Sequence, residues 1–126
     1  MTEQATKRVL LVDDDRDILA AMDTALKDLG LEVATASDGN EALVRAEEKL
    51  PDVVVLDMML PKRSGFLVME KLKKGKKKSD KPRVIMITGN QGSRHRVYAE
   101  SLGVEIYLNK PFRMEKLLES VKKLLG

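Results

Sequence analysis

The sequence has no cysteine and few aromatic residues, and both absences narrow what the protein can be. Without cysteine, the chain can form neither disulfide bonds nor thiolate metal sites, and it has no cysteine nucleophile. Aromatic residues make up 3% of the 126 residues and hydrophobic residues 43%, so we expect an interior packed mainly from aliphatic side chains and methionine. The single histidine, His95, excludes multi-histidine metal sites and argues against a histidine-dependent catalytic triad.

The sequence also lacks long apolar runs. The first residues, "MTEQATKR", are polar and have no signal-peptide character. No run approaches the roughly 20 apolar residues that a membrane-spanning helix needs. We therefore expect a protein without a membrane span and in the cytoplasm, which the absence of cysteine also suits. The length is that of one ordinary domain, and we expect a tail over residues 1–6 and a single domain over 7–126.

The net charge of +3 is unevenly distributed. The segment Lys71–Arg83, "KLKKGKKKSDKPR", holds eight Lys or Arg residues and one Asp, so the rest of the chain is mildly acidic. A dense run of like charge is usually a solvated, mobile loop, and that is the structural expectation here. Contact with an acidic partner protein is the main functional alternative. Nucleic-acid binding is disfavoured because no aromatic residue interrupts the run to stack on bases.

Short apolar segments alternate with amphipathic segments along the chain. The apolar segments predict strands over residues 8–12, 31–36, 53–56, 83–88 and 105–108. The amphipathic segments predict helices over residues 16–30, 40–50, 64–74, 91–102 and 113–125. Strictly alternating strands and helices indicate an α/β domain with a parallel sheet that is covered on both faces. In such sheets, ligands bind beyond the carboxyl ends of the strands.

Polar side chains follow several of these strands. Asp13 and Asp14 follow the first strand, Asp57 the third, Thr88 ends the fourth, and Lys110 follows the fifth. Adjacent carboxylates repel one another, and a bound Mg²⁺ would relieve that repulsion because it prefers oxygen ligands. A hydroxyl and an ammonium group suit the oxygens of a phosphoryl group, and an Asp carboxylate can act as the nucleophile. Each residue alone also has an ordinary explanation as a helix cap, strand residue or turn.

Four motifs carry a resemblance to a known family. In order, they are "LLVDDD", "VVVLDMMLPKRSG", "VIMITGN" and "YLNKPF". Together they resemble the receiver domain of two-component response regulators, in its stand-alone single-domain form, over residues 7–125. The resemblance implies a flavodoxin-like (CheY-like) doubly wound (βα)5 fold with a five-stranded parallel sheet of order 2-1-3-4-5. It also implies a phosphoprotein of a phosphorelay that catalyses only its own phosphorylation and dephosphorylation, and so is not otherwise an enzyme.

The resemblance assigns metal and acceptor roles. Asp57 would accept the phosphoryl group from the phospho-His of a histidine kinase. Mg²⁺, or Mn²⁺, would bind Asp14 and Asp57 directly, Asp13 largely through water, and the backbone carbonyl of Met59.

The same resemblance assigns a switch. Thr88 and Lys110 would hold the phosphoryl oxygens, and Tyr107 would report the state of Thr88 through its rotamer. Pro111 would follow a cis peptide bond that aims Lys110. Asp15 falls outside the site and is expected to cap the first helix.

Two positions are variable in this family and modulate how water reaches the acyl phosphate. They are Met59 and Asn90 here, and we expect this pair to tune the phosphoryl lifetime. Gly89 departs from the family's usual alanine or other small residue, which leaves room for the phosphoryl group but adds backbone freedom.

Output would be a protein–protein contact. The expected partners are a histidine kinase or phosphotransfer protein and an unknown downstream protein target. The fourth helix, fifth strand and fifth helix would form the switched face, which could also form a dimer. The main alternative is a degenerate receiver that acts as a binding module through Lys71–Arg83. A phosphatase or Mg²⁺-dependent hydrolase ranks lower, because a chain this short lacks a substrate-binding cap.

Overall fold

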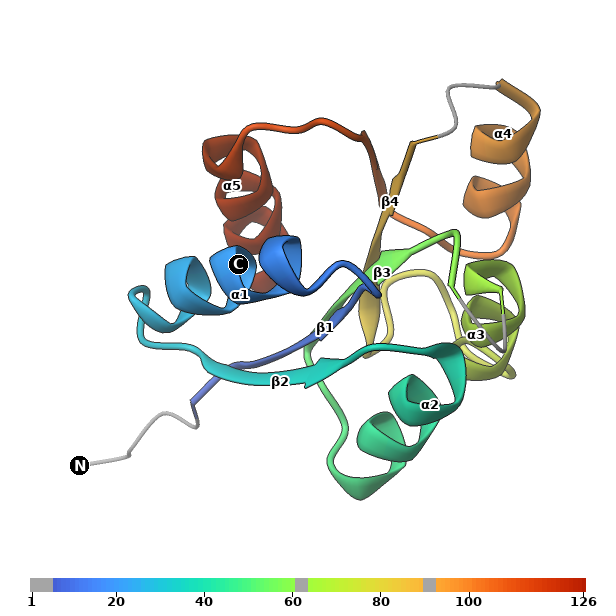
Figure 1. Cartoon of the computed structure of the whole chain (residues 1–126). Coiled ribbons are helices and arrows are strands. Elements are labelled where there is room, and N and C mark those ends of the chain that lie inside the picture. Colours follow the sequence, from blue (N-terminus) through green and yellow to red (C-terminus); the bar gives the residue numbers. More distant parts are fainter. Residues whose placement is uncertain (1–5, 61–63, 90–92) are drawn as a thin grey trace.

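The computed structural model describes residues 6–60, 64–89 and 93–126 (Figure 1). The strands are β1 (Arg8–Val12), β2 (Glu32–Ala36), β3 (Val53–Asp57), β4 (Arg83–Thr88) and β5 (Ile106–Asn109). The helices are α1 (Arg16–Lys27), α2 (Gly39–Glu48), α3 (Gly65–Leu72), α4 (Ser93–Ser101) and α5 (Met114–Leu125). Each predicted segment therefore overlaps an element of the predicted type, although α2 begins one residue earlier than predicted and β3 and β5 end one residue later. Within the described ranges, no helix combines the length and apolar character needed to cross a membrane.

The strands form one parallel sheet in the order β2-β1-β3-β4-β5. This confirms the predicted flavodoxin-like fold. The register pairs Val12 with Leu56, Asp57 with Ile87, and Thr88 with Asn109. The carboxyl ends of β1, β3, β4 and β5 therefore meet at one edge of the sheet, where the predicted site residues follow them.

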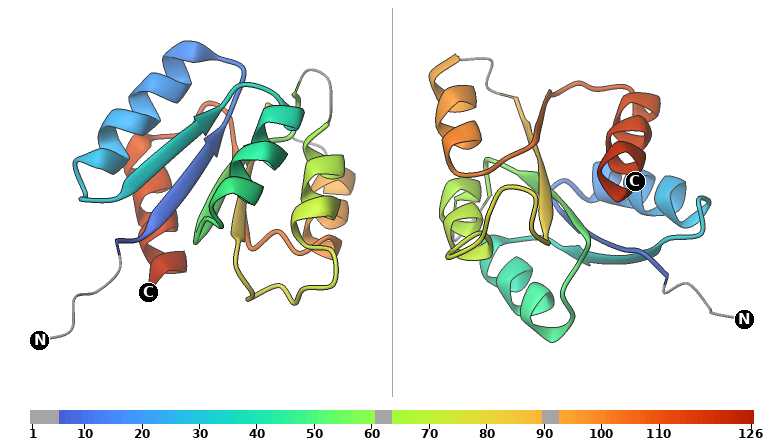
Figure 2. Two further views of the ribbon diagram at one scale, coloured as in Figure 1. Left: turned by 90° about the horizontal axis from the view of Figure 1, so that it is seen from below. Right: turned by 180° about the vertical axis from the view of Figure 1, so that it is seen from behind.

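Helices cover both faces of the sheet (Figures 1 and 2). On one face, α1 and α5 bury Met22, Leu26, Leu117 and Val121 against alternate strand residues. On the other face, α2, α3 and α4 pack their apolar side chains against the remaining strand residues. All five residues of β3 are buried, as its continuous apolar sequence predicts, because this central strand has a helical layer on each side.

Asp15 caps the amino end of helix α1, as predicted. The carboxylate of Asp15 accepts hydrogen bonds from the backbone N–H groups of Asp17 and Ile18, at 3.0 and 3.2 Å. A carboxylate at this position satisfies otherwise unpaired N–H groups and interacts favourably with the helix dipole. The third aspartate of the run is thus used by the helix, which leaves Asp13 and Asp14 for the site.

The lysine-rich segment between α3 and β4 differs from the prediction. Lys73 is buried, and its Nζ donates to the carbonyl oxygens of Lys78, Asp80 and Pro82 at 3.0, 2.7 and 3.2 Å. The expectation of a wholly solvated run is therefore wrong for Lys73. The physical reason is local: three main-chain carbonyl groups surround the ammonium group and replace its hydration.

Candidate functional site

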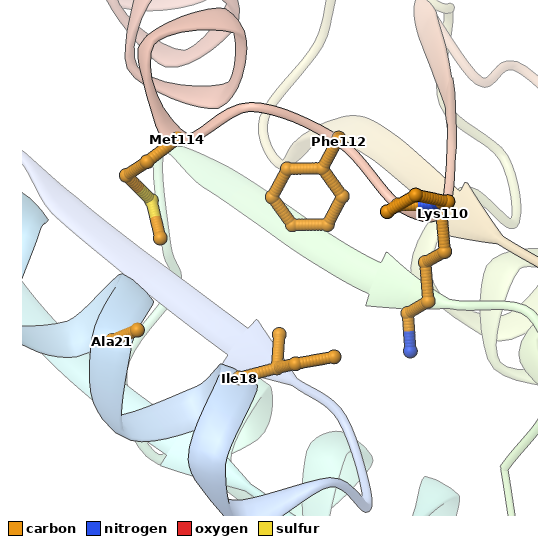
Figure 3. Close-up of a pocket in the computed structure, with 6 residues that line it drawn as sticks. Ile18, Ala21, Lys110, Phe112 and Met114 are labelled. Carbon is orange, nitrogen blue, oxygen red and sulfur yellow. The ribbon is translucent and has the colours of Figure 1, made fainter.

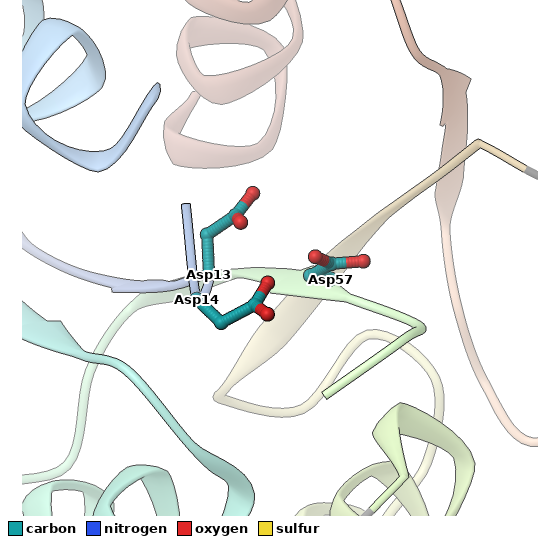
Figure 4. A group of neighbouring side chains, drawn as sticks. All are labelled: Asp13, Asp14 and Asp57. Carbon is teal, nitrogen blue, oxygen red and sulfur yellow. The ribbon is translucent and has the colours of Figure 1, made fainter. Parts of the chain in front are cut away.

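Three carboxylates meet where β1 and β3 end (Figure 4). Asp13, Asp14 and Asp57 each place one oxygen within 4.8 Å of the others. Asp13 is fully buried, Asp57 is 3% exposed, and Asp14 is exposed to solvent. The strand order brings them together, because β1 and β3 are neighbours in the sheet although about 40 residues separate them in the chain. The acidic cluster predicted at this edge is therefore present.

Lys110 joins the two buried carboxylates. Its Nζ lies 3.0 Å from Oδ2 of Asp13 and 3.2 Å from Oδ2 of Asp57. The other oxygen of each carboxylate accepts a main-chain hydrogen bond, from the N–H of Asp15 at 2.9 Å and of Met59 at 3.0 Å. Each buried carboxylate is thus held at both oxygens, which fixes its orientation within the site.

The electrostatics of the cluster are only partly balanced. Burial raises the pKa of Asp57, the charge of Asp13 adds to that rise, and the Met59 N–H and Lys110 oppose it. For Lys110, burial would lower the pKa, but the contacts with Asp13 and Asp57 outweigh burial and raise it. Three carboxylates and one ammonium group leave an excess of two negative charges when all are ionised.

This donor set fits a divalent cation. Its ligand atoms are carboxylate oxygens, and the exposure of Asp14 leaves one side of the cluster open to water. Mg²⁺ prefers one or two carboxylates together with water molecules, and Mn²⁺ accepts similar ligands. The excess negative charge is also of the size that a divalent cation would neutralise. The residues present are therefore those that such a site requires.

Thr88 and Tyr107 lie next to each other on β4 and β5. Thr88 is fully buried, and its carbonyl oxygen accepts a hydrogen bond from the backbone N–H of Lys110 at 2.7 Å. Burial raises the pKa of Tyr107, and a side-chain hydrogen bond with Thr88 opposes this rise. Tyr107 is half-buried and packs against the core beneath α4. The hydroxyl and the aromatic residue expected to act together are therefore in contact.

Of the remaining predicted positions, the structure describes Met59 and Pro111. The side chain of Met59 is 66% exposed just beyond Asp57. The Lys110–Pro111 peptide bond is cis, as the resemblance implied. Asn90 lies outside the described residues.

Gly65 is a positioning residue that the sequence analysis did not single out. It begins α3, and its N–H donates to the carbonyl oxygen of Met58 at 2.9 Å. A Cβ atom at Gly65 would lie 2.6 Å from the carbonyl oxygen of Asp57 and 2.7 Å from Cα of Met58. Glycine thus lets the start of α3 approach the backbone that carries Asp57. The quoted motif "PKRSG" contained this residue, but only the folded backbone shows what it touches.

A pocket of about 380 Å³ opens beside the site (Figure 3). It lies between α1 and the segment that joins β5 to α5. Its lining consists of Ile18, Ala21, Lys110, Pro111, Phe112 and Met114. The lining is mainly apolar, apart from Lys110, which connects this pocket to the acidic cluster. The sequence analysis did not predict it, because its walls come from segments about 90 residues apart.

Comparisons with known proteins agree with this geometry. The family profile described as the response regulator receiver domain matches residues 9–122. The alkaline phosphatase synthesis transcriptional regulatory protein PhoP of Bacillus subtilis is 37% identical over 94% of this chain and 48% of its own length. The transcriptional regulatory protein PrrA of Mycobacterium tuberculosis is 40% identical over 98% of this chain and 52% of its own. The chain thus spans about half the length of these curated relatives.

Solved receiver domain structures also resemble this chain, and the similarity extends over nearly their full length. A CheY-like response regulator receiver domain protein from Methanospirillum hungatei is 33% identical, with a TM-score of 0.83, over 95% of this chain and 94% of that one. The chemotaxis response regulator CheY4 of Vibrio cholerae is 30% identical, with a TM-score of 0.85, over 95% of this chain and 99% of that one. The chain belongs to the response regulator receiver domain family of two-component systems.

Proposed function

We propose that this receiver domain is a phosphoryl-accepting switch and that Asp57 is its acceptor. The observation that carries the proposal is the position of Asp57. Its buried carboxylate lies against the ammonium group of Lys110 and within 4.8 Å of two further carboxylates. Phosphoryl transfer depends mainly on positioning and charge neutralisation, and this arrangement supports both.

The transfer step follows from these contacts. A carboxylate oxygen of Asp57 attacks the phosphorus of a phosphohistidine, so that an O–P bond forms as the P–N bond breaks. The imidazole leaves with the electron pair of the broken bond and takes up a proton. The ammonium group of Lys110 and the hydroxyl of Thr88 stabilise the negative charge on the transferred oxygens. The same aspartyl phosphate is later hydrolysed by water, and the pair Met59 and Asn90 tunes that rate.

Asp13, Asp14, Asp57 and the backbone carbonyl of Met59 would hold Mg²⁺ or Mn²⁺ in this proposal. The bound cation would supply positive charge that lets the negatively charged phosphoryl group approach three carboxylates.

The phosphoryl donor is a histidine kinase or a phosphotransfer protein. The apolar pocket beside Lys110 supports a protein donor, because it offers hydrophobic contact area at the entrance to the site. A small phosphodonor would reach Asp57 without using this pocket.

The output is a protein contact on the face formed by α4, β5 and α5. Thr88 and Tyr107 link the acceptor site to this face through their hydrogen bond. On α4, Val97 is 67% exposed, which gives the face apolar contact area. Phosphorylation would bias a two-state equilibrium towards the form that binds a downstream protein or a second copy of the chain.

The degenerate-receiver alternative drops the switch and keeps a binding role. The complete set of acidic residues, Thr88 and Lys110 favours the switch, since a domain that never accepts a phosphoryl group has no need to bury Asp57 beside Asp13. The proposal includes no turnover of a diffusible substrate. It places the protein in the cytoplasm, which the cysteine-free composition suits.

The test is intact-protein mass spectrometry after incubation with Mg²⁺ and acetyl phosphate, with Asp57→Asn as the matched control. We expect one added phosphoryl group on the wild type, none on the variant, and none in the presence of a chelator. A wild type that stays unmodified would then be exposed to beryllofluoride with Mg²⁺. The absence of any structural change under both treatments would reject Asp57 as a working acceptor.

A further inference from the structure

A basic surface lies at the end of the sheet opposite the acidic cluster. We call residues 73–82, between α3 and β4, the lysine loop. Five lysines of the loop are exposed, as is Lys71 at the end of α3. The loop lysines are Lys74, Lys76, Lys77, Lys78 and Lys81. The loop leads into the amino end of β4 (Figure 2). Asp57 lies at the carboxyl end of β3. A partner at the lysine loop would therefore leave the acceptor site accessible.

The loop is held in one shape by its own contacts. The buried Lys73 gathers three of its carbonyl groups, as described above. Nζ of Lys76 donates to the carbonyl oxygen of Lys81 at 2.9 Å, and the carboxylate of Asp80 accepts the N–H of Lys77 at 2.8 Å. Nζ of Lys81 pairs with Asp52 at 2.8 Å, which ties the loop to the start of β3. A pre-shaped loop loses less conformational entropy when it binds a partner.

A groove lined by apolar and charged residues adjoins this charge. It has a volume of about 180 Å³ and lies between α2 and the lysine loop. Its lining consists of Leu43, Ala46, Glu47, Leu50, Lys71, Leu72, Lys76 and Pro82. Leu50 is 52% exposed, and the charged residues of the lining are Lys71, Lys76 and Glu47. The groove thus combines room for one apolar side chain with two lysines and one glutamate in its lining, a net positive charge.

We propose that the lysine loop and this groove bind an acidic segment of a partner protein, with an apolar side chain of that segment in the groove. The charge of the loop selects an acidic partner and speeds the encounter. The groove selects a protein over a nucleic acid, because a phosphate backbone carries no aliphatic side chain. The run from Lys71 to Arg83 also contains no aromatic ring on which a base could stack. This inference does not depend on phosphorylation of Asp57.

The test uses two labelled peptides and two matched variants of the full chain. The peptides are glutamate-rich and differ in one central residue, leucine or alanine, and their binding is followed by fluorescence anisotropy at several salt concentrations. The loop variant carries Lys74→Glu, Lys77→Glu and Lys78→Glu. The control carries Lys116→Glu, Lys122→Glu and Lys123→Glu on the exposed side of α5, which changes the net charge equally.

We expect the loop variant to bind the leucine peptide about tenfold or more weakly than the wild type, and the α5 control to bind within about twofold. The alanine peptide should bind the wild type several-fold more weakly. Leu50→Asp should remove this preference for leucine while circular dichroism shows an unchanged fold. Equal losses in the two charge variants, equal affinity for the two peptides, or no binding at low salt would each overturn the proposal. A single-stranded oligonucleotide that binds the loop more tightly than the leucine peptide would overturn it in favour of nucleic acid.

Discussion

The charge of Asp57 should make the metal-free domain less stable than a variant that lacks this charge. At an effective dielectric constant of about 20, two unit charges at the 4.8 Å upper limit of the cluster repel by about 3.5 kcal/mol, and charges 3.2 Å apart attract by about 5 kcal/mol. The contact with Lys110 therefore offsets the repulsion from Asp13 but leaves the cost of burying the Asp57 carboxylate. The raised pKa of Asp57 agrees that the ionised form is disfavoured.

Asp57→Asn removes this charge and keeps an amide oxygen that can accept the Met59 N–H. We expect the free energy of unfolding in EDTA at pH 7 to rise by about 1 kcal/mol, which corresponds to about 4 °C in the melting temperature. The pKa of Asp57 is raised in the folded protein, so the folded state binds the proton of this carboxyl group more tightly than the unfolded state does. The stability gained from that proton is fully present below the unfolded-state pKa and is lost as the pH rises through the folded-state pKa. The advantage of the variant should therefore shrink as the pH is lowered towards 4.

Mg²⁺ should reverse the order of stability. A cation at 100 times its dissociation constant stabilises the protein that binds it by about 2.7 kcal/mol, and Asp57→Asn removes one of the carboxylate ligands. Urea unfolding with EDTA and with Mg²⁺ measures both effects on the same two proteins. A variant less stable than the wild type in EDTA, or an equal gain from Mg²⁺ in both proteins, would refute this account of the site.

Three further substitutions probe the contacts around the site and the lysine loop. Gly65→Ala should lower the free energy of unfolding by about 1–3 kcal/mol in urea, because its Cβ meets the Asp57 carbonyl; an unchanged value would mean that α3 can shift at little cost. Lys73→Met should lower the free energy of unfolding by about 2–4 kcal/mol and speed hydrogen exchange of the Lys76 and Lys77 amides, because three carbonyl groups lose their donor. Unchanged exchange would show that the loop does not need the ammonium group. Lys110→Met should lower the free energy of unfolding in EDTA by about 3–5 kcal/mol, since two buried carboxylates lose their counter-charge. Mg²⁺ should restore part of this stability. A smaller loss in EDTA than in Mg²⁺ would contradict the account.

The sequence predicted the elements well because each follows from a local pattern. The four consecutive apolar residues of β3 and the periodic apolar residues of α1 and α5 indicate a strand and two helices without reference to the rest of the chain. Boundaries were less certain where a tertiary contact decides them. Helix α3 ends at Leu72, before the predicted residue 74, and the next residue, Lys73, turns inward to three carbonyl groups of the following loop. No periodicity signals that turn.

The candidate site was predictable only in part. That polar residues follow the strands was visible in the sequence, but their convergence depends on the strand order, which the resemblance to receiver domains supplied. Gly65 and the pocket beside Lys110 went unrecognised because both are defined by what approaches in space. Gly65 meets the backbone of Asp57, and the pocket needs Ile18 from α1 and Phe112 from the segment before α5.

The three consecutive aspartates after β1 have three different roles. Asp15 uses its carboxylate on the first N–H groups of α1, and Asp13 divides its oxygens between the N–H of Asp15 and Lys110. Asp14 remains exposed at the open side of the cluster. The run of like charges is therefore tolerated because two of its members have local partners. The excess negative charge of the whole cluster would repel an arriving phosphoryl group, and this repulsion is the physical reason why a divalent cation belongs to the proposed reaction.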